Sequence, residues 1–347
     1  MTDVRIDELR RCLAAAFEQL DLAADDAEAL AGLLLDSELR GHRDHGIAAL
    51  APLTAMYRDG RLNPRPRVKV LSETDGALLL NGDRGCGPGA PLRAMRWCIE
   101  RARERGGMAV AAVRDWQLLV GAPSARLAAE QGLIGFACTN FMPLVAPPGG
   151  RTPVLGTNPF AYGLPAGRHP PVVLDVATTL VAMQKVRVAA ARGEQLPDGL
   201  IFDRAGRPAT DPAAFLDGGS LAPLGTPHAP HKGFGLALLV DVLSGVLSGS
   251  GFGQGMAASA PGVHLWALDI EALLPADAFR ARMDELIDQI RDGERAPGVE
   301  ELVVPGERGE RRHRELTARG VVPLDDSGWE MLRSGCEALG VTPPDVS

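Results

Sequence analysis

Residues 76–113 read GALLLNGDRGCGPGAPLRAMRWCIERARERGGMAVAAV, and this stretch decides the fold class. The apolar run at 76–82 predicts a short strand, and the run at 108–113 predicts a buried one. Between them, residues 90–107 carry apolar side chains at helical spacing and end on glycine. That pattern predicts a helix with a C-terminal glycine stop. The order strand, helix, strand is typical of α/β proteins.

The alternation continues on both sides of this stretch. Apolar patterns predict further elements as follows: strands at 133–138, 171–178 and 262–270, and helices at 6–22, 27–41, 124–132, 276–293 and 327–340. Residues 232–249, KGFGLALLVDVLSGVLSG, predict a long helix that is apolar on most faces, so we expect it to be buried. The fold class is therefore α/β (mixed α+β), with helical material at both chain ends and a domain boundary near 70–76.

Composition excludes several classes of function. A net charge of −8 over 347 residues argues against a nucleic-acid surface. The longest apolar stretch is interrupted by Asp241 and is shorter than a membrane span needs. Acidic residues throughout the N-terminal helix argue against a signal peptide. Five widely spaced cysteines without a CxxC pair argue against a disulfide framework or a zinc site. We therefore expect a cytoplasmic protein that binds neither nucleic acid nor membrane.

Familiar nucleotide and hydrolase motifs are absent. The chain has no GxxxxGK[ST], no GxSxG and no HExxH. Its glycine clusters, GDRGCGPG and GSGFGQG, do not fit GxGxxG in register, and the second follows a helix rather than a strand. A Rossmann-type cofactor site is therefore not predicted.

Three short segments carry side chains suited to chemistry. His42 and His45 are three residues apart, which fits a general acid or base, a metal pair or local hydrogen bonding. Asp175 ends an apolar strand, where it either faces a site or caps the next turn. Lys232 and the glycines of HKGFG precede a helix, where they either receive a phosphate or are ordinary solvated residues. Two long Gly/Pro-rich loops, 143–159 and 221–235, are also candidates for function.

Taken together, these segments resemble the malate/L-lactate/ureidoglycolate dehydrogenase family, which includes cyclic imino-acid reductases. The resemblance runs over nearly the whole chain and is carried, in order, by SELRGHRDHG, GRLNPRP, TNFMPLVAPPGGRTPVLGTNPFA, VVLDVATT, KVRVAAARGEQLP, HKGFGLALLVDVLSGVLSG and RGVVPL. It implies a non-Rossmann cofactor domain around a mixed sheet at 76–299. It also implies a helical substrate and dimer domain from 1–75 and about 300–347, in a homodimer with its site near the interface.

The resemblance also implies an activity and a set of residues. Members transfer a hydride between NADH or NADPH and the C=O or C=N carbon of a small 2-oxo acid or cyclic imine. His45 corresponds to the proton-transfer residue and Asp175 to the acid that supports it. The cofactor-binding positions implied are Thr139, Asn140, Thr157, Asn158, Pro159, Thr178, Lys185, Lys232 and Gly233. No metal is implied.

The substrate pocket departs from the family pattern. The Ser before the catalytic His is Asp44 here, and the usual carboxylate-binding Arg is replaced by Ala49, or by Ala48 with a one-residue shift. Leu118 lies in the segment that normally supplies a second His. Losing the Arg removes a charge-assisted contact worth roughly 1.5–3 kcal/mol.

Three interpretations follow from these departures. The first is an active reductase with an altered pocket lined by Arg43, Asp44 and Leu118. Its substrate is either neutral or cationic, or it is an acid bound by Arg43 or Arg40 in place of the missing arginine. Asp44 would then raise the pKa of His45. The second is an ordinary family enzyme with a relocated anion clamp. The third is a homologue that lost catalysis and serves as a binding or assembly protein.

Overall fold

The computed structural model describes residues 1–256 and 261–344. Its centre is a seven-stranded mixed sheet in the order β2-β3-β4-β11-β5-β6-β7. The strands are β2 (Lys69–Glu73), β3 (Ala77–Cys86), β4 (Met108–Gln117), β5 (Ile134–Thr139), β6 (Phe160–Leu164), β7 (Val172–Val176) and β11 (Val263–Leu268). Among the described strands of this sheet, only β3 and β4 pair in parallel, because helix α4 (Gly89–Arg105) crosses between them; the other described neighbours are antiparallel. The expected mixed α/β class is confirmed.

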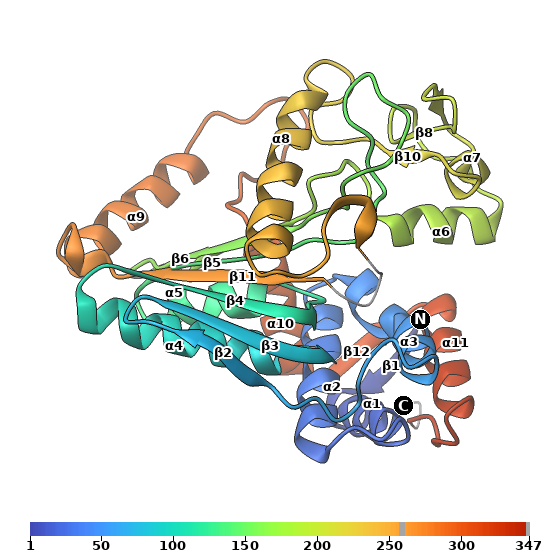
Figure 1. Cartoon of the computed structure of the whole chain (residues 1–347), viewed down its shortest axis with the longest axis horizontal. Coiled ribbons are helices and arrows are strands. Elements are labelled where there is room, and N and C mark those ends of the chain that lie inside the picture. Colours follow the sequence, from blue (N-terminus) through green and yellow to red (C-terminus); the bar gives the residue numbers. More distant parts are fainter. Residues whose placement is uncertain (257–260, 345–347) are drawn as a thin grey trace.

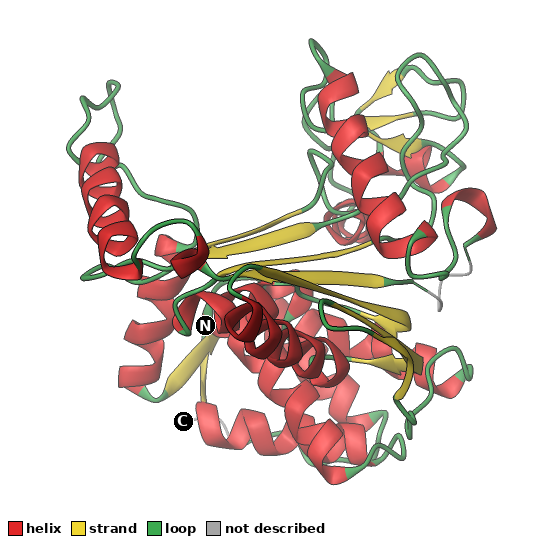
Figure 2. Cartoon of the chain, turned by 60° about the vertical axis from the view of Figure 1, so that its left-hand side comes forward, coloured by secondary structure: helices red, strands yellow, loops and turns green. Residues whose placement is uncertain are grey.

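The two faces of this sheet are covered differently (Figure 1). Helices α4 and α5 (Ala122–Glu130) pack on one face and enclose an apolar core with β3, β4, β5 and β11. On the opposite side lie α8 (Pro230–Asp241) and the π-helical turn η3 (Val242–Val246), which contacts β4, β5 and β11. Figure 2 shows the sheet between these two layers.

A helical region is assembled from both ends of the chain. Its elements are β1 (Thr2–Arg5), α1 (Ile6–Glu18), α2 (Ala24–Leu39), η1 (Arg43–His45), η2 (Ile47–Ala49), α3 (Leu50–Arg58), α10 (Glu307–Arg319), β12 (Val321–Leu324) and α11 (Asp326–Glu337). Strand β1 pairs with β12, and one apolar core joins side chains from 4–62 with others from 316–339. The boundaries proposed for the two domains remain predictions. The final residues of the range 300–347 lie outside the described part of the chain.

Several elements have too little apolar periodicity to be expected from the sequence. These are β1, β2, β6, β12, α10, the small sheet β8 (Ile201–Phe202), β9 (Pro208–Ala209) and β10 (Ser220–Leu221), and the helices α6 (Met183–Arg192) and α7 (Pro212–Leu216). Helix α9 (Ala276–Arg291) was expected; η4 (Gly253–Gly255) and η5 (Ile270–Ala272) are single turns. None of the described helices is long and apolar enough to span a bilayer.

The expectation that residues 232–249 form one buried helix is wrong in two respects. The α-helix ends at Asp241, and the chain continues as the π-helical turn η3. Its inner face carries small or polar residues, among them Gly233, Ala237 and Ser244, whereas large apolar side chains point outward. Leu239, for example, is 53% exposed in the single chain.

Candidate active site

A side chain of α2 holds the loop that carries His45 through a hydrogen bond. Glu38, which is buried, accepts a hydrogen bond from the backbone N–H of Ile47 at 3.2 Å. Gly46 makes this approach possible, because a Cβ there would lie 2.2 Å from the Glu38 carboxylate. Burial raises the pKa of Glu38 although the Ile47 N–H opposes it. The side chain of His45 is left free to meet solvent or substrate.

His45 is exposed in the single chain, yet the protein around the ring lowers its pKa. Burial is the largest cause, Asp44 opposes it, and His42 adds to it. Asp44 acts in the raising direction, as expected, but burial outweighs it and the net pKa of His45 is lowered. The imidazole is largely neutral at neutral pH, which suits a group that both accepts and returns a proton.

Arg40 and Arg43, which were expected to bind the substrate in place of the missing arginine, are both held in ion pairs. Arg43 pairs with Asp325 and lies 3.9 Å from Glu38. Arg40 meets Asp36 at 3.0 Å and Glu310 at 2.8 Å, with a side chain only 12% exposed. Leaving those partners would cost Arg40 its charge-assisted bonds. A role for Arg43 in substrate binding remains a prediction.

Asp175 stands at the N-terminus of α5. Its Oδ2 accepts hydrogen bonds from the backbone N–H groups of Gly121 and Ala122, both at 2.8 Å. Burial raises the pKa of Asp175 to about 6, while the two amides and Arg126 act in the lowering direction. Among the described residues nothing bonds its Oδ1. Asp175 therefore caps a helix and still has an oxygen available to a neighbour.

Most of the expected cofactor residues are tied into the protein. Asn140 and Asn158 are fully buried, and both donate to the Asp241 carboxylate, at 3.2 and 3.3 Å. Thr178 donates to the carbonyl of Thr157 at 2.9 Å. Thr139 and Pro159 are also tied into the protein. The Thr139 hydroxyl donates to the Gly262 carbonyl, and the Pro159 carbonyl accepts the Thr139 N–H. These side chains brace loops, so contacts from this group to a cofactor would come from the backbone.

Asp241 is the centre of this bracing, a role that its sequence pattern alone does not reveal. Besides the two asparagines, it accepts the N–H of Gly253 at 3.1 Å, and it is only 4% exposed. Hydrogen-bond donors such as these offset the cost of burying a carboxylate. Asn158 is held with φ of 35°, a conformation that non-glycine residues seldom adopt. The available signal was a charged residue inside an apolar helix.

The two Gly/Pro-rich loops meet at a cavity of about 440 Å³. Residues of 146–151 line it on one side, and Pro223, Thr226 and Pro230 line it where α8 begins. Nearby, Gly233 is required by close packing, because a Cβ there would lie 2.4 Å from the backbone nitrogen of Leu224. Lys232 is exposed at the start of α8, and Lys185 is exposed on α6. The cavity therefore lies at the N-terminus of α8, and neither lysine is among the residues that line it.

Leu118 does not line an open pocket in the single chain. It is 5% exposed and belongs to the core under the sheet. Its substrate contact remains a prediction. Among the described residues, no group of three or more His, Cys, Asp or Glu gathers as a metal site would require.

Known proteins resemble this chain in sequence and in fold. The family model described as malate/L-lactate dehydrogenase matches residues 4–333. The chain is 35% identical to the malate dehydrogenase of Pyrococcus abyssi, covering 87% of this chain and 86% of that one. It is 29% identical to the Delta(1)-pyrroline-2-carboxylate/Delta(1)-piperideine-2-carboxylate reductase of Pseudomonas putida, covering 92% of each. The structure of malate dehydrogenase from Pyrococcus horikoshii superposes with a TM-score of 0.88 at 29% identity, covering 99% of this chain and 97% of that one. The chain therefore belongs to the malate/L-lactate dehydrogenase family and is an NAD(P)-dependent oxidoreductase.

Proposed function

We propose that the protein transfers a hydride between NADH or NADPH and the C=O or C=N carbon of a small 2-oxo acid, cyclic imine or related substrate, in an atypical pocket. One observation carries the proposal. His45 is a solvent-accessible imidazole with a lowered pKa, on a loop anchored by a buried carboxylate, in a chain of this family. Relatives named as malate dehydrogenases and as a cyclic imino-acid reductase support both substrate classes.

His45 supplies the proton in this mechanism. When bound, the nicotinamide supplies or takes up the hydride. During reduction, the His45 imidazolium donates its proton to the substrate oxygen or nitrogen, and during oxidation the neutral ring takes that proton back. Asp175 holds the start of α5 through two amides and keeps Oδ1 available to orient the imidazole or the substrate. Asp44 stabilises the charged imidazole.

The cofactor would be held by the loops that meet at the 440 Å³ cavity. Lys232 and Lys185 would pair with its phosphates, and Gly233 allows the backbone to approach closely. The buried bonds of Asn140, Asn158 and Thr178 keep those loops in place before the cofactor binds. Such preorganisation lowers the entropy cost of binding.

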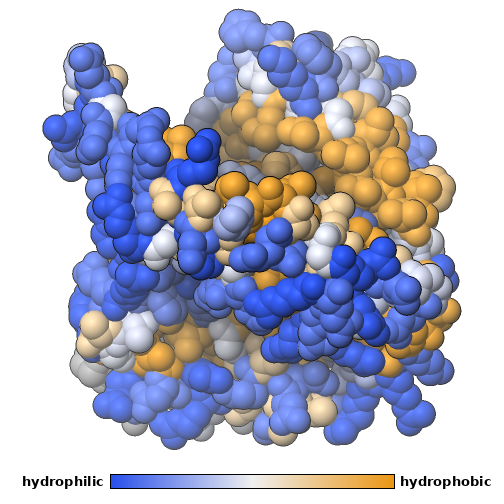
Figure 3. Space-filling model, turned by 90° about the vertical axis from the view of Figure 1, so that its left-hand side faces the viewer, coloured by the Kyte–Doolittle hydropathy of each residue, from blue (hydrophilic) through white to orange (hydrophobic). Residues whose placement is uncertain are grey.

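The outward apolar face of α8 and η3 supports a homodimer with this surface at its interface. The face contains Leu236, Leu238, Leu239, Val242, Val246 and Leu247, each at least 41% exposed. Figure 3 shows apolar side chains gathered on the upper part of the molecule, on the side that α8 occupies in Figure 2. Helix α8 places small residues toward the protein and large apolar residues outward, which is the pattern of a helix that packs against a partner. A second copy of the chain presents the same patch and can cover it symmetrically.

We also propose a cytoplasmic location. The support is that all five cysteines are free thiols, which a reducing compartment maintains.

Cofactor binding tests the proposal directly. Titration with NADPH and with NADH should raise the melting temperature for at least one of them. Absorbance of the reduced cofactor then reports turnover on 2-oxo acids, cyclic imines and neutral carbonyls. Ordinary efficiency on pyruvate or oxaloacetate would contradict the altered pocket, and no thermal shift with either cofactor would contradict the proposed activity.

A further inference from the structure

Arg126 lies one helical turn into α5, on the same face as Ala122. The Ala122 amide is one of the two that hold Asp175, at 2.8 Å. Helical side chains tilt toward the N-terminus, so Arg126 leans toward the end of α5 that Asp175 caps, while its guanidinium meets Asp36. Arg126 acts to lower the pKa of Asp175, and it also acts to lower that of His42, beside His45. Arg126 is therefore within electrostatic reach of Asp175 and of His42, which precedes His45 by three residues.

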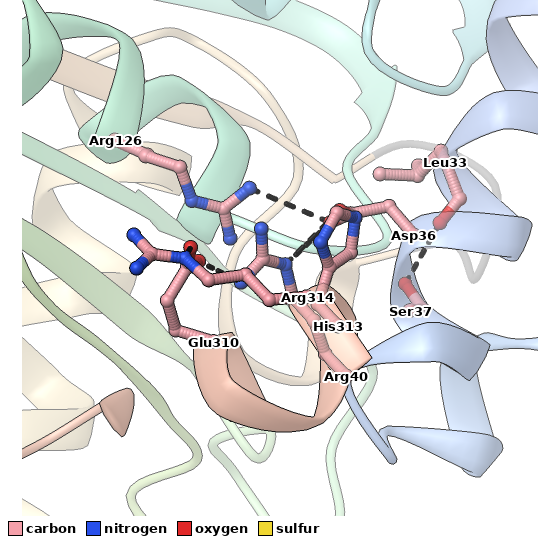
Figure 4. A network of polar contacts seen from close by, with 8 residues as sticks. All are labelled: Leu33, Asp36, Ser37, Arg40, Arg126, Glu310, His313 and Arg314. Atoms are coloured by element: carbon pink, nitrogen blue, oxygen red, sulfur yellow. Dashed lines mark hydrogen bonds and ion pairs between the residues drawn. The ribbon is translucent and has the colours of Figure 1, made fainter. Parts of the chain in front are cut away.

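Opposite Arg126, α2 and α10 present a charged cluster (Figure 4). Asp36 lies at its centre, and its most strongly bound partner is Arg40, whose Nε meets both carboxylate oxygens at 3.0 Å. His313 Nε2 lies 3.4 Å from the same carboxylate. Arg126 is held most weakly, by one contact of 3.5 Å from Nη1.

The charge of Asp36 is thus already balanced before Arg126 is counted. In the drawn cluster, two carboxylates, Asp36 and Glu310, face three guanidiniums, those of Arg40, Arg126 and Arg314. The side chain of Arg126 is only 17% exposed, so the guanidinium is largely shielded from solvent. Among the described residues, no other hydrogen-bond partner for its guanidinium is found. A shielded cation with unused donors attracts an anion.

We propose that Arg126 binds the substrate carboxylate and replaces the arginine that is missing after His45. The inference rests on the proposed function and specifies its substrate: an acid, held by a guanidinium from the sheet region rather than from the histidine loop. A planar carboxylate accepts two parallel N–H bonds from such a fork. Arg126 exchanges its single long contact with Asp36 for that pair.

Two substitutions with opposite expected effects test this assignment. Arg126→Gln should weaken binding of oxalate, a 2-oxo-acid analogue, roughly tenfold to a hundredfold, and raise the KM of an acid substrate similarly. The KM of the matching carboxamide should not change. Asp36→Asn removes the competing carboxylate and should tighten oxalate binding. Arg126→Lys keeps the charge without the fork and should give an intermediate loss.

A control separates folding from binding. Arg103→Gln on α4 removes an exposed arginine that bonds Gln131, near the far end of α5, and should leave oxalate binding unchanged. The assignment is overturned if Arg126→Gln binds oxalate as the parent does, or if Asp36→Asn weakens binding as much as Arg126→Gln, which is the result of a purely bracing contact. Oxalate binding by thermal shift needs no turnover. It therefore tests Arg126 even if no reduced cofactor is consumed, an outcome that would contradict the proposed function alone.

Discussion

Replacing Asp175 by Asn should separate the stability of this protein from its activity. The rise in the pKa of Asp175 from 3.8 to about 6 corresponds to about 3 kcal/mol that favours the protonated carboxyl in the folded state. Because the folded pKa is the higher one, this contribution is complete below the unfolded pKa and is lost as pH rises through about 6. The parent should therefore lose stability that the Asn variant keeps. An Asn oxygen can still accept the two α5 amides.

The assay is urea unfolding of both proteins between about pH 3 and about pH 8. The free energy of unfolding of the parent minus that of Asp175→Asn should fall by about 3 kcal/mol over this range. Turnover should fall strongly in the variant, since the carboxylate proposed to orient the imidazole or the substrate is gone.

Asp284→Asn is the matched control with the opposite sign. Burial acts to raise the pKa of Asp284, but the N–H groups of Arg168, His169 and Gly167 outweigh it, and the net pKa is lowered. The parent should therefore lose stability relative to this variant as pH falls. A difference between the parent and Asp175→Asn that does not vary with pH would refute the reasoning about Asp175.

Two further predictions concern the histidine and the apolar face. In the reduction direction, kcat/KM should fall as pH rises through a value below 6.5, because His45 must be protonated and burial lowers its pKa, with Asp44 opposing and His42 assisting. The His45→Gln variant should lack this pH dependence. A parent profile that is flat down to about pH 5 would contradict the prediction. Leu239→Asp places a charge on the apolar face of α8 and should convert a dimer into a monomer in analytical ultracentrifugation. Leu273→Asp changes an 81% exposed leucine elsewhere and should leave the dimer intact. A dimer that survives Leu239→Asp would place the interface elsewhere.

The core of the fold could be predicted because its signals are local. Helix α4 combines an apolar stripe with Gly106 in the left-handed conformation, so its end is written in the sequence. Strands β1 and β12 could not be found this way, because each is four residues long and exists through pairing with the other end of the chain. The orientation of α8 could not be predicted either, since its apolar residues predict burial but do not indicate whether the sheet or a partner covers them.

The candidate site divides along the same line. His45 and Asp175 follow from motifs, and both lie in segments that the structure anchors firmly. Asp44 raises the pKa of His45, as its place in the sequence predicts, whereas the packed protein that lowers the net pKa is not visible in the sequence. Arg126 carried no signal at all. Its significance arises only where α5 meets α2 and α10, which are far apart in the chain.

The most direct test of the central claim is steady-state oxidation of NADPH or NADH by the parent and by His45→Gln, over a panel of 2-oxo acids and cyclic imines. Both proteins should show the same thermal shift with the cofactor, because His45 takes no part in holding it. The parent should turn over at least one acid of the panel, and His45→Gln should lose roughly a hundredfold or more in kcat, as removal of a general acid does. Equal kcat values for the two proteins on that substrate would contradict the assignment of His45 and the mechanism built on it.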